Sequence, residues 1–411
     1  MPPSIVFVLL LGFQAGALTG FQINLAEQGM KALDEKRYQA AVDSFKQAVA
    51  ADPKDYSLHF NLALAYSLMG QHAEAIPEYK KTLELKPGLV QAELNLGISL
   101  LREKQPADAV PYLTAAAENA KEYRPNYYLA EALLGAGEPT KAEQAYTAAL
   151  AIDPKSPAAE LGLAHALAKE QRLDDAAAHF KKAAELDARY RDDLLELASL
   201  YEAAKQPEPA MGIYQQFPDN PGAQERLGEL LLQAGRPADA IPCLETAVAK
   251  SPSDANRAAL AEAYLKNNAP DKALPVVEKI LESTPNDFEI RMLHGRIIRD
   301  QRKFPEAAAE FARAAQLKPD APQAWSEMAN VLVMEENYPQ ALGALDRVVA
   351  LHAEKAGHVF LRAIVLDKMR DLKPALASYQ RFLEMSHGEF PNQEFQARQR
   401  AKTLEREISK Q

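Results

Sequence analysis

The sequence predicts an all-α protein, a right-handed superhelical solenoid of antiparallel helix pairs with a helix capping its C-terminal end. Three observations lead to this prediction: an alanine that recurs at a nearly constant spacing, small and bulky residues at fixed distances from it, and turn residues between helical stretches. Successive alanines are 33 or 34 residues apart, except for one gap of 30. The series is Ala41, Ala75, Ala109, Ala142, Ala176, Ala210, Ala240, Ala273, Ala307, Ala341 and Ala375.

Each repeat is expected to form one helical hairpin. A Gly or Ala lies twelve residues before each alanine, and a bulky residue such as Phe45, Tyr79 or Phe311 lies four residues after it. Small residues are required where two helices approach closely, and the bulky residue fills the space beside them. Turn residues such as Gly70 separate the two apolar stretches. Because such a hairpin cannot bury both faces alone, neighbouring hairpins must stack.

Residues 1–21 contain no charged side chain and are expected to form a signal peptide. Residues 5–11 are an apolar run of suitable length, and small residues follow at 15–17. Because no Lys or Arg precedes this run, a buried or frayed N-terminus stays open as the alternative. A permanent anchor is disfavoured, since Gln14 interrupts the apolar stretch, which is shorter than the ~20 residues that span a bilayer. We therefore expect a periplasmic or secreted protein, or a cytoplasmic one if the segment is not cleaved.

Residues 22–387 are expected to hold eleven repeats, and residues 388–411 a capping helix. In the sixth repeat two prolines, Pro218 and Pro221, accompany the loss of four residues and shorten the second helix. Fewer apolar contacts there predict a joint near residues 216–222. The tail helix is expected to begin at Pro391, with a short basic docking helix as the alternative reading. Its expected apolar stripe is Phe395, Ala397, Ala401, Leu404 and Ile408.

Composition and charge exclude several classes of protein. Of the 411 residues, 47% are hydrophobic and 25% are charged, which excludes a disordered, collagen-like or polytopic membrane protein. With 47 basic and 57 acidic residues, the formal charge of −10 predicts no general attraction to nucleic acid. The single cysteine, Cys243, permits neither an internal disulfide nor a cysteine-based zinc site.

No catalytic motif is found in the sequence, and the tail is too short for a catalytic domain. The motifs H-E-x-x-H, G-x-S-x-G, the Walker loop and G-x-G-x-x-G are all absent. The eight histidines show no metal-ligand spacing, and His72 lies at the register of Tyr38 and Tyr338, which favours a packing role. We therefore expect no enzyme activity, no cofactor and no metal.

The chain resembles the tetratricopeptide repeat family, whose 34-residue signature W…L-G…Y…A…F…P is matched in parts by every repeat. The opening Trp is matched by Trp325, followed by Met328, Ala329 and Leu332. The departures are the end of the third repeat, where Lys121 replaces the closing proline, and the short sixth repeat. The resemblance implies binding of protein or peptide partners in a concave groove that is lined mainly by the first helix of each hairpin.

Within that groove, repeats two to four carry the residues most typical of a peptide site. Asn61 and Asn95 share one register on adjacent repeats, and an asparagine amide can both donate to and accept from a peptide backbone. Similar asparagine ladders occur in some peptide-binding members of the family, and aromatic residues beside Arg are typical of binding hot spots. The candidate residues, expected to be partly solvent-facing, are Phe60, Asn61, Leu64, Gln91, Asn95, Arg102, Arg124, Tyr127 and Tyr128.

Alternatives to this site remain open. The aromatic residues could simply pack between hairpins while the asparagines solvate the groove. A second, basic surface would be formed by Arg291, Arg296, Arg299, Arg302 and Lys303, although acidic residues lie among them.

Two functions remain open from the sequence. The first is an exported, non-catalytic scaffold whose groove binds a protein or an extended peptide. The second is an accessory subunit of a larger cell-envelope assembly, such as a polysaccharide-export machine, in which a partner supplies the chemistry. Direct glycan binding is less favoured, because the groove offers few stacked aromatic residues.

Overall fold

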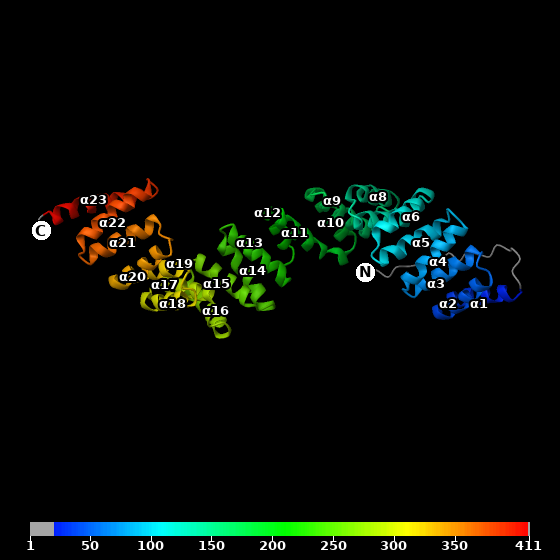
Figure 1. Ribbon diagram of the computed structural model, residues 1–411, viewed down its shortest axis with the longest axis horizontal. Coiled ribbons are helices and arrows are strands. Elements are labelled where there is room, and N and C mark those ends of the chain that lie inside the picture. Colours follow the sequence, from blue (N-terminus) through cyan, green and yellow to red (C-terminus); the bar gives the residue numbers. More distant parts are fainter. Residues whose placement is uncertain (1–19, 410–411) are drawn as a thin grey trace. The chain divides into compact units, whose positions relative to one another are not determined.

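The computed structural model describes residues 20–409. Within that range the chain forms 23 α-helices and one short 3-10 helix, and no strand (Figure 1). This number fits eleven helix pairs followed by a single helix, and the predicted all-α fold is confirmed. Most of the predicted signal peptide lies outside the described residues, and its last two residues, Gly20 and Phe21, begin α1.

The chain divides into two compact units, residues 1–210 and 211–411. Unit 1 contains α1 (Gly20–Asp34), α2 (Tyr38–Ala51), α3 (Tyr56–Leu68), α4 (His72–Leu85), α5 (Val90–Arg102), α6 (Pro106–Asn119), α7 (Tyr123–Gly135), α8 (Pro139–Ile152), α9 (Pro157–Lys169), α10 (Leu173–Leu186), η1 (Ala188–Tyr190) and α11 (Asp193–Ala203). The division falls within α12 (Pro207–Tyr214).

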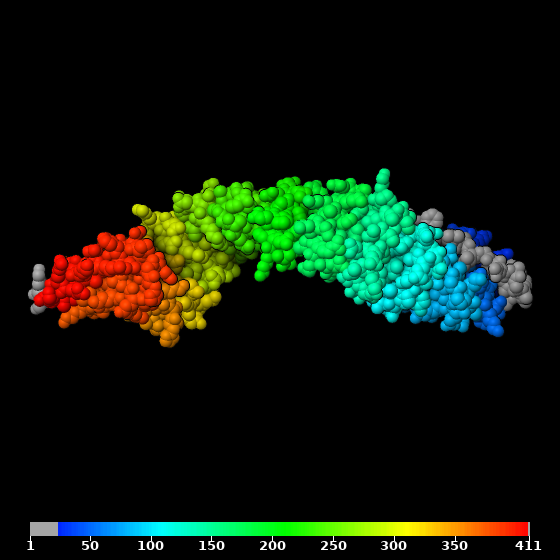
Figure 2. Space-filling view, turned by 90° about the horizontal axis from the view of Figure 1, so that it is seen from above, coloured from blue at the N-terminus to red at the C-terminus, as the bar shows by residue number. Residues whose placement is uncertain are grey.

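Unit 2 contains α13 (Pro221–Gln233), α14 (Pro237–Lys250), α15 (Asp254–Lys266), α16 (Pro270–Ser283), α17 (Phe288–Asp300), α18 (Phe304–Leu317), α19 (Pro322–Met334), α20 (Tyr338–Ala350), α21 (Ala356–Lys368), α22 (Leu372–Ser386) and α23 (Pro391–Ile408). Within each unit every helix packs against the next one along the chain, so the colours follow one another without interruption (Figure 2).

The second helix of the sixth repeat is short, as predicted. Helix α12 has 8 residues, whereas α10 and α14 each have 14. It ends at Tyr214, before the two prolines of the sequence Phe217-Pro218-Asp219-Asn220-Pro221.

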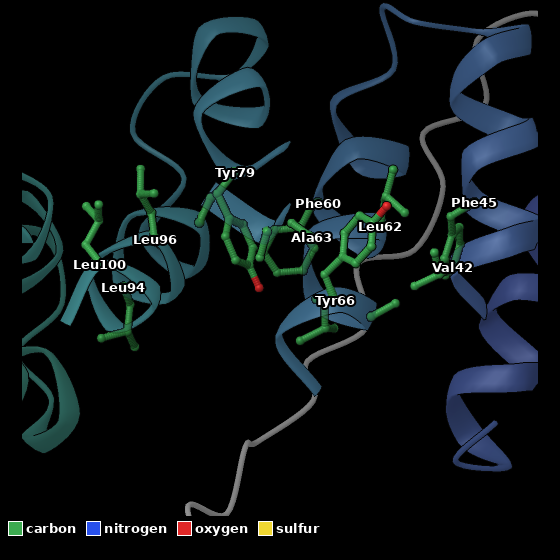
Figure 3. Close-up of a cluster of buried hydrophobic side chains, with 14 of the residues drawn as sticks. Val42, Phe45, Phe60, Leu62, Ala63, Tyr66, Tyr79, Leu94, Leu96 and Leu100 are labelled. Carbon is green, nitrogen blue, oxygen red and sulfur yellow. The ribbon is translucent and has the colours of Figure 1, made fainter. Parts of the chain in front are cut away.

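The small residues of the repeat lie where two helices of a pair are closest. A Cβ atom added to Gly97 of α5 would lie 2.3 Å from the Leu113 side chain of α6, and one added to Gly29 would lie 2.7 Å from the ring of Phe45. The predicted pairing of a small residue with a bulky one sixteen positions later is therefore confirmed at these sites. In the core of unit 1 the Phe60 ring packs edge-on against Tyr79, with ring centroids 5.9 Å apart (Figure 3).

Each turn between the two helices of a pair contains one residue in the left-handed region. Gly137, for example, has a φ of 81°, and Lys104 has a φ of 59°. A left-handed residue ends the first helix and lets the chain reverse direction. The residues with this conformation at the turns are Lys36, Gly70, Lys104, Gly137, Gln171, Lys205, Gly235, Asn268, Arg302, Glu336 and Arg370.

Helix α23 begins at Pro391, as predicted, and packs against α22. Ala397, Ala401 and Leu404 are buried in this contact, and Ile408 is partly buried. Phe395 was expected on the same stripe, but 64% of it is exposed, so that prediction is wrong. The reason is helical geometry, because a residue two positions before Ala397 lies on the opposite side of the helix.

Candidate functional site

A cavity of about 1170 Å³ lies in unit 1 along the first helices of repeats two to four. It is lined mainly by residues of α3, α5 and α7, with further residues from α1, α2, α4 and α9 and from the turns between α1 and α2 and between α3 and α4. We call this cavity the groove. Six of the nine predicted site residues line it: Leu64, Asn95, Arg102, Arg124, Tyr127 and Tyr128.

The other three predicted residues lie outside the lining of the groove. Phe60 is 1% exposed and Asn61 is 0% exposed, so their expected solvent exposure is not observed. Helix α3 is buried continuously from Ser57 to Tyr66, and most of the side chains in this stretch are apolar. Both amide atoms of Asn61 lack a hydrogen-bond partner among the described residues. Gln91 is half-buried.

The α7 wall of the groove consists of packed tyrosines. The rings of Tyr123 and Tyr127 are stacked with centroids 5.5 Å apart, and Tyr128 meets Tyr127 edge-on at 5.3 Å. The Tyr127 hydroxyl donates to a carboxylate oxygen of Glu131 at 2.8 Å, and the Tyr123 hydroxyl lies 2.6 Å from the Ser156 hydroxyl. These contacts hold the rings in place, so the wall is ordered before any ligand binds.

The charges around the groove favour an anionic ligand. The guanidinium of Arg124 lies over the ring of Tyr128, 5.9 Å from its centroid. Arg102 and Lys36 add two more cationic groups, whereas only Asp34 and Glu131 supply carboxyl groups. Burial raises the pKa of the Glu131 carboxyl, although the hydrogen bond from Tyr127 and the charge of Arg102 oppose this shift. A carboxyl group with a raised pKa is less fully ionised, which further reduces the negative charge of the wall.

The floor of the groove is polar, and sequence reasoning missed most of it. The Ser67 hydroxyl donates to the Tyr79 hydroxyl at 3.3 Å and lies 3.4 Å from the Ser99 hydroxyl. The Asn95 amide also hydrogen-bonds to Tyr79, and His72 Nδ1 lies 3.4 Å from the Ser99 hydroxyl. Ser67 could have been identified from its position in the sequence, because it follows Leu64 by about one helical turn and so lies on the same face of α3.

His72 combines its expected packing with a place in the groove lining. Burial lowers the pKa of this histidine, and the charge of Arg102 lowers it further. The ring is therefore neutral at neutral pH, and it adds a polar but uncharged group to the floor.

The alternative surfaces in unit 2 are less suited to binding an anion. The lining of a second cavity, of about 500 Å³, has three carboxylates and two cationic groups: Glu229, Glu262, Glu289, Lys266 and Arg296. The basic surface of α17 is partly neutralised: Arg291 pairs with Glu310 at 2.7 Å, and Arg299 pairs with Asp300 of the same helix and with Glu327 of α19.

Residues 20–409 contain no group of three or more His, Cys, Asp and Glu side chains that could hold a metal ion. Burial raises the pKa of the Cys243 thiol, so thiolate formation is disfavoured. In the same range, no helix combines the length and the apolar character needed to cross a bilayer.

Comparison with known proteins agrees with the repeat architecture. Models of tetratricopeptide repeats match residues 32–99, 94–157, 212–260 and 231–297, which together make up about half of the chain. The chain belongs to the tetratricopeptide repeat family. The matches include parts of both units, and none of them extends beyond residue 297.

The relatives of this chain have names that state different functions. The human protein O-mannosyl-transferase TMTC3 is 24% identical over 346 residues, which are 77% of this chain and 38% of that protein. The photosystem I assembly protein Ycf3 of Acaryochloris marina is 34% identical over 91 residues, or 21% of this chain and 55% of that protein. The E3 ubiquitin-protein ligase CHIP of Arabidopsis thaliana is 25% identical over 116 residues, or 28% and 42%. The chain thus spans less than two thirds of the length of each of these relatives.

Among solved structures, MamA from Desulfovibrio magneticus is 24% identical to this chain, with a TM-score of 0.40. The likeness covers 42% of this chain and 98% of that one.

Proposed function

We propose that this tetratricopeptide repeat protein is a non-catalytic scaffold that binds an extended segment of a protein partner in the groove of repeats two to four. The observation that carries the proposal is the groove itself, an ordered cavity of about 1170 Å³ with a tyrosine wall, a polar floor and an excess of cationic groups. Such a cavity can accept a backbone and an acidic side chain or terminal carboxylate together.

Asn95 and Arg124 have complementary roles in this proposal. The half-buried amide of Asn95 offers donors and an acceptor to a peptide backbone, while Arg124 offers a counter-ion to a carboxylate. Asn61 lies at the same register one repeat earlier, and its buried amide has no partner among the described residues. Because Asn61 is fully buried and lies outside the groove lining, the proposal assigns the backbone contact to Asn95.

We further propose that the protein is exported, on the strength of the uncharged, apolar residues 1–21. The mass of the native protein tests this point. A mature chain that begins near residues 18–21 supports export, whereas a cytoplasmic protein that retains residues 5–11 refutes it.

The groove is tested by Asn95→Ala and Tyr128→Ala in the full chain, with Asn119→Ala on the exposed face of α6 as the matched control. A partner is first recovered with the wild-type protein from a cell-envelope extract, and its affinity is then measured by calorimetry. Each groove variant is expected to bind about 1–3 kcal/mol more weakly, as when a hydrogen bond or a hot-spot contact is lost.

The control variant is expected to bind as the wild type does. Equal affinity in all three variants would move the site elsewhere, and the face of α17 that carries Arg296 and Arg299 would be tested next. A large fall in melting temperature for Asn95→Ala would instead assign that amide a structural role.

A further inference from the structure

His59 of α3 contacts both the second helix of its own repeat, α4, and the connection from the preceding repeat. Its side chain is 6% exposed, on α3, the helix that also carries the groove residues Leu64 and Ser67. The ring atom Nδ1 lies 2.6 Å from a carboxylate oxygen of Glu78 on α4. The other ring nitrogen, Nε2, lies 3.1 Å from the carbonyl oxygen of Pro53, in the connection from the preceding repeat.

The two hydrogen-bond partners of His59 determine how many protons His59 and Glu78 must hold together. A carboxylate oxygen and a peptide carbonyl oxygen are both acceptors, and a neutral imidazole ring has only one N–H to donate. Both contacts are therefore satisfied only if the pair of His59 and Glu78 holds one proton more than a neutral ring and a carboxylate do. With that proton on the ring, His59 donates from both nitrogens and is cationic.

In repeats nine and ten of unit 2, the residue at the same register makes a similar contact. Arg291, at the equivalent place on α17, donates to the carbonyl of Pro285 at 2.8 Å and pairs with Glu310 of α18 at 2.7 Å. Trp325 on α19 donates to the carbonyl of Pro319 at 3.0 Å. In each case the acceptor lies six residues upstream, at the end of the preceding repeat. The position anchors the first helix of a repeat to the repeat before it.

Of these three anchors only the one at His59 can lose its donor near neutral pH, because arginine stays charged and the indole N–H does not ionise. We propose that His59 is a positioning residue of the groove, which holds α3 to both the preceding repeat and Glu78 of α4 only while its ring carries two protons. The effect on partner binding rests on the proposed function, whereas the anchor itself does not.

The charged groups around His59 favour this state. The hydrogen bond to Glu78 holds the pKa of His59 above its ordinary value; burial opposes the shift, the Pro53 carbonyl adds to it, and the charge of Lys81 on α4 opposes it. The connection that carries Pro53 also contains Asp52, Lys54 and Asp55, and Asp55 accepts a hydrogen bond from the backbone of Ser57 at 2.8 Å.

The sign of the pH dependence follows from this direction. Because the folded-state pKa is raised, the anchor is fully formed below the ordinary histidine pKa of about 6.5 and is lost as the pH rises through the folded value. Loss of one N–H releases the ring from the carbonyl of Pro53 or from Glu78. Helix α3, and with it one side of the groove, then becomes less firmly held.

Two measurements on the full chain test the proposal without a partner. An NMR titration of the His59 ring is expected to give a pKa above 6.5. Hydrogen-exchange protection of the amides of residues 64–68, relative to those of α5, is expected to fall about threefold or more between pH 6.5 and 9. The variant His59→Arg, which reproduces the anchor of Arg291, is expected to lose this pH dependence. His352→Gln, at an exposed histidine of unit 2, is the matched control and should retain it.

A ring pKa at or below 6.5, or an equal pH profile in the wild type and in His59→Gln, would overturn the proposal. If His59→Arg does not fold, Glu78→Gln takes its place, and it should lower the ring pKa and move the loss of protection to lower pH. An unchanged profile in Glu78→Gln would also overturn the proposal. The proposed function fails separately, if Asn95→Ala and Tyr128→Ala bind a recovered partner as the wild type does.

Discussion

Glu310 shows how a buried carboxylate stays ionised in unit 2. Only 5% of this residue is exposed, and two arginines and a histidine surround it. Arg291 lies 2.7 Å and His294 3.3 Å from one of its oxygens, and Arg313 pairs with the other. Burial alone would raise the pKa of this carboxyl, but the contacts with His294 and Arg291 outweigh it and lower the pKa to about 2.

The first prediction concerns acid stability. A folded-state pKa below the ordinary value means that the stabilisation is present above the ordinary glutamate pKa of about 4.3 and is lost as the pH falls through about 2. Its size is about 3 kcal/mol, from a shift of roughly two units. Glu310→Gln should therefore unfold at a lower urea concentration than the wild type at pH 7, and the difference should shrink toward pH 2.

Glu289→Gln is the matched control for this experiment. Its side chain is 75% exposed and makes only a long contact with Lys318. An exposed ion pair contributes about 0–1 kcal/mol, so this variant should follow the wild type closely. If the stability of Glu310→Gln, measured by urea unfolding, depended on pH in the same way as that of Glu289→Gln, the lowered pKa of Glu310 would be contradicted.

At the scale of the helix pair, the short distance between the two helices limits the size of the side chains that fit between them. At Gly97 the added Cβ atom would lie 2.3 Å from Leu113, a fully buried side chain of the second helix. At Gly343, in the middle of α20, nothing lies within 4 Å of such an atom. Gly97 belongs to the series of small residues that lie twelve positions before each repeat alanine, whereas Gly343 does not, and only Gly97 lies where two helices meet.

The second prediction uses this pair of glycines. Gly97→Ala should destabilise unit 1 by about 1–3 kcal/mol, because the two helices must move apart. Gly343→Ala should stabilise unit 2 by up to about 1 kcal/mol, since alanine favours an open helical position more than glycine does. Urea unfolding of the full chain, followed with a probe in each unit, measures both changes. Effects of the same sign would show that helix propensity, and not close approach, governs these positions.

At the scale of the whole molecule, the short second helix of the sixth repeat is the main irregularity. The division between the two compact units falls in this helix, α12, near the joint that the sequence predicts at residues 216–222. A helix of 8 residues offers fewer apolar contacts than one of 14, and stacked repeats are held only by their neighbours. The weakness of this joint remains a prediction.

The third prediction is that limited proteolysis first cuts between residues 216 and 222. The connection at residues 284–287 is the internal control, because it is also exposed and contains a proline but follows a helix of 14 residues. Two fragments that correspond to the two units should accumulate early in the digestion. Cleavage at 284–287 at the same rate, or only near the termini, would rule out a weak joint.

The repeat architecture and much of the groove could be predicted from the sequence. The alanine series, the small residues and the turn residues all follow from local geometry, and they place the helices, the short α12 and the start of α23 correctly. Position on a helix also identified Leu64, Asn95 and Tyr128 as groove residues, because the face of a helix is determined by its period of 3.6 residues.

The repeat, its period and the face on which each side chain lies therefore follow from the sequence alone. Which of those faces stay open to solvent depends on tertiary contacts. Asn61 and Asn95 share one register, yet the first is completely buried and the second lines the groove. The anchor at His59 likewise depends on Glu78, nineteen residues away. Exposure and pairing are set by residues distant in the chain, and local periodicity carries no information about them.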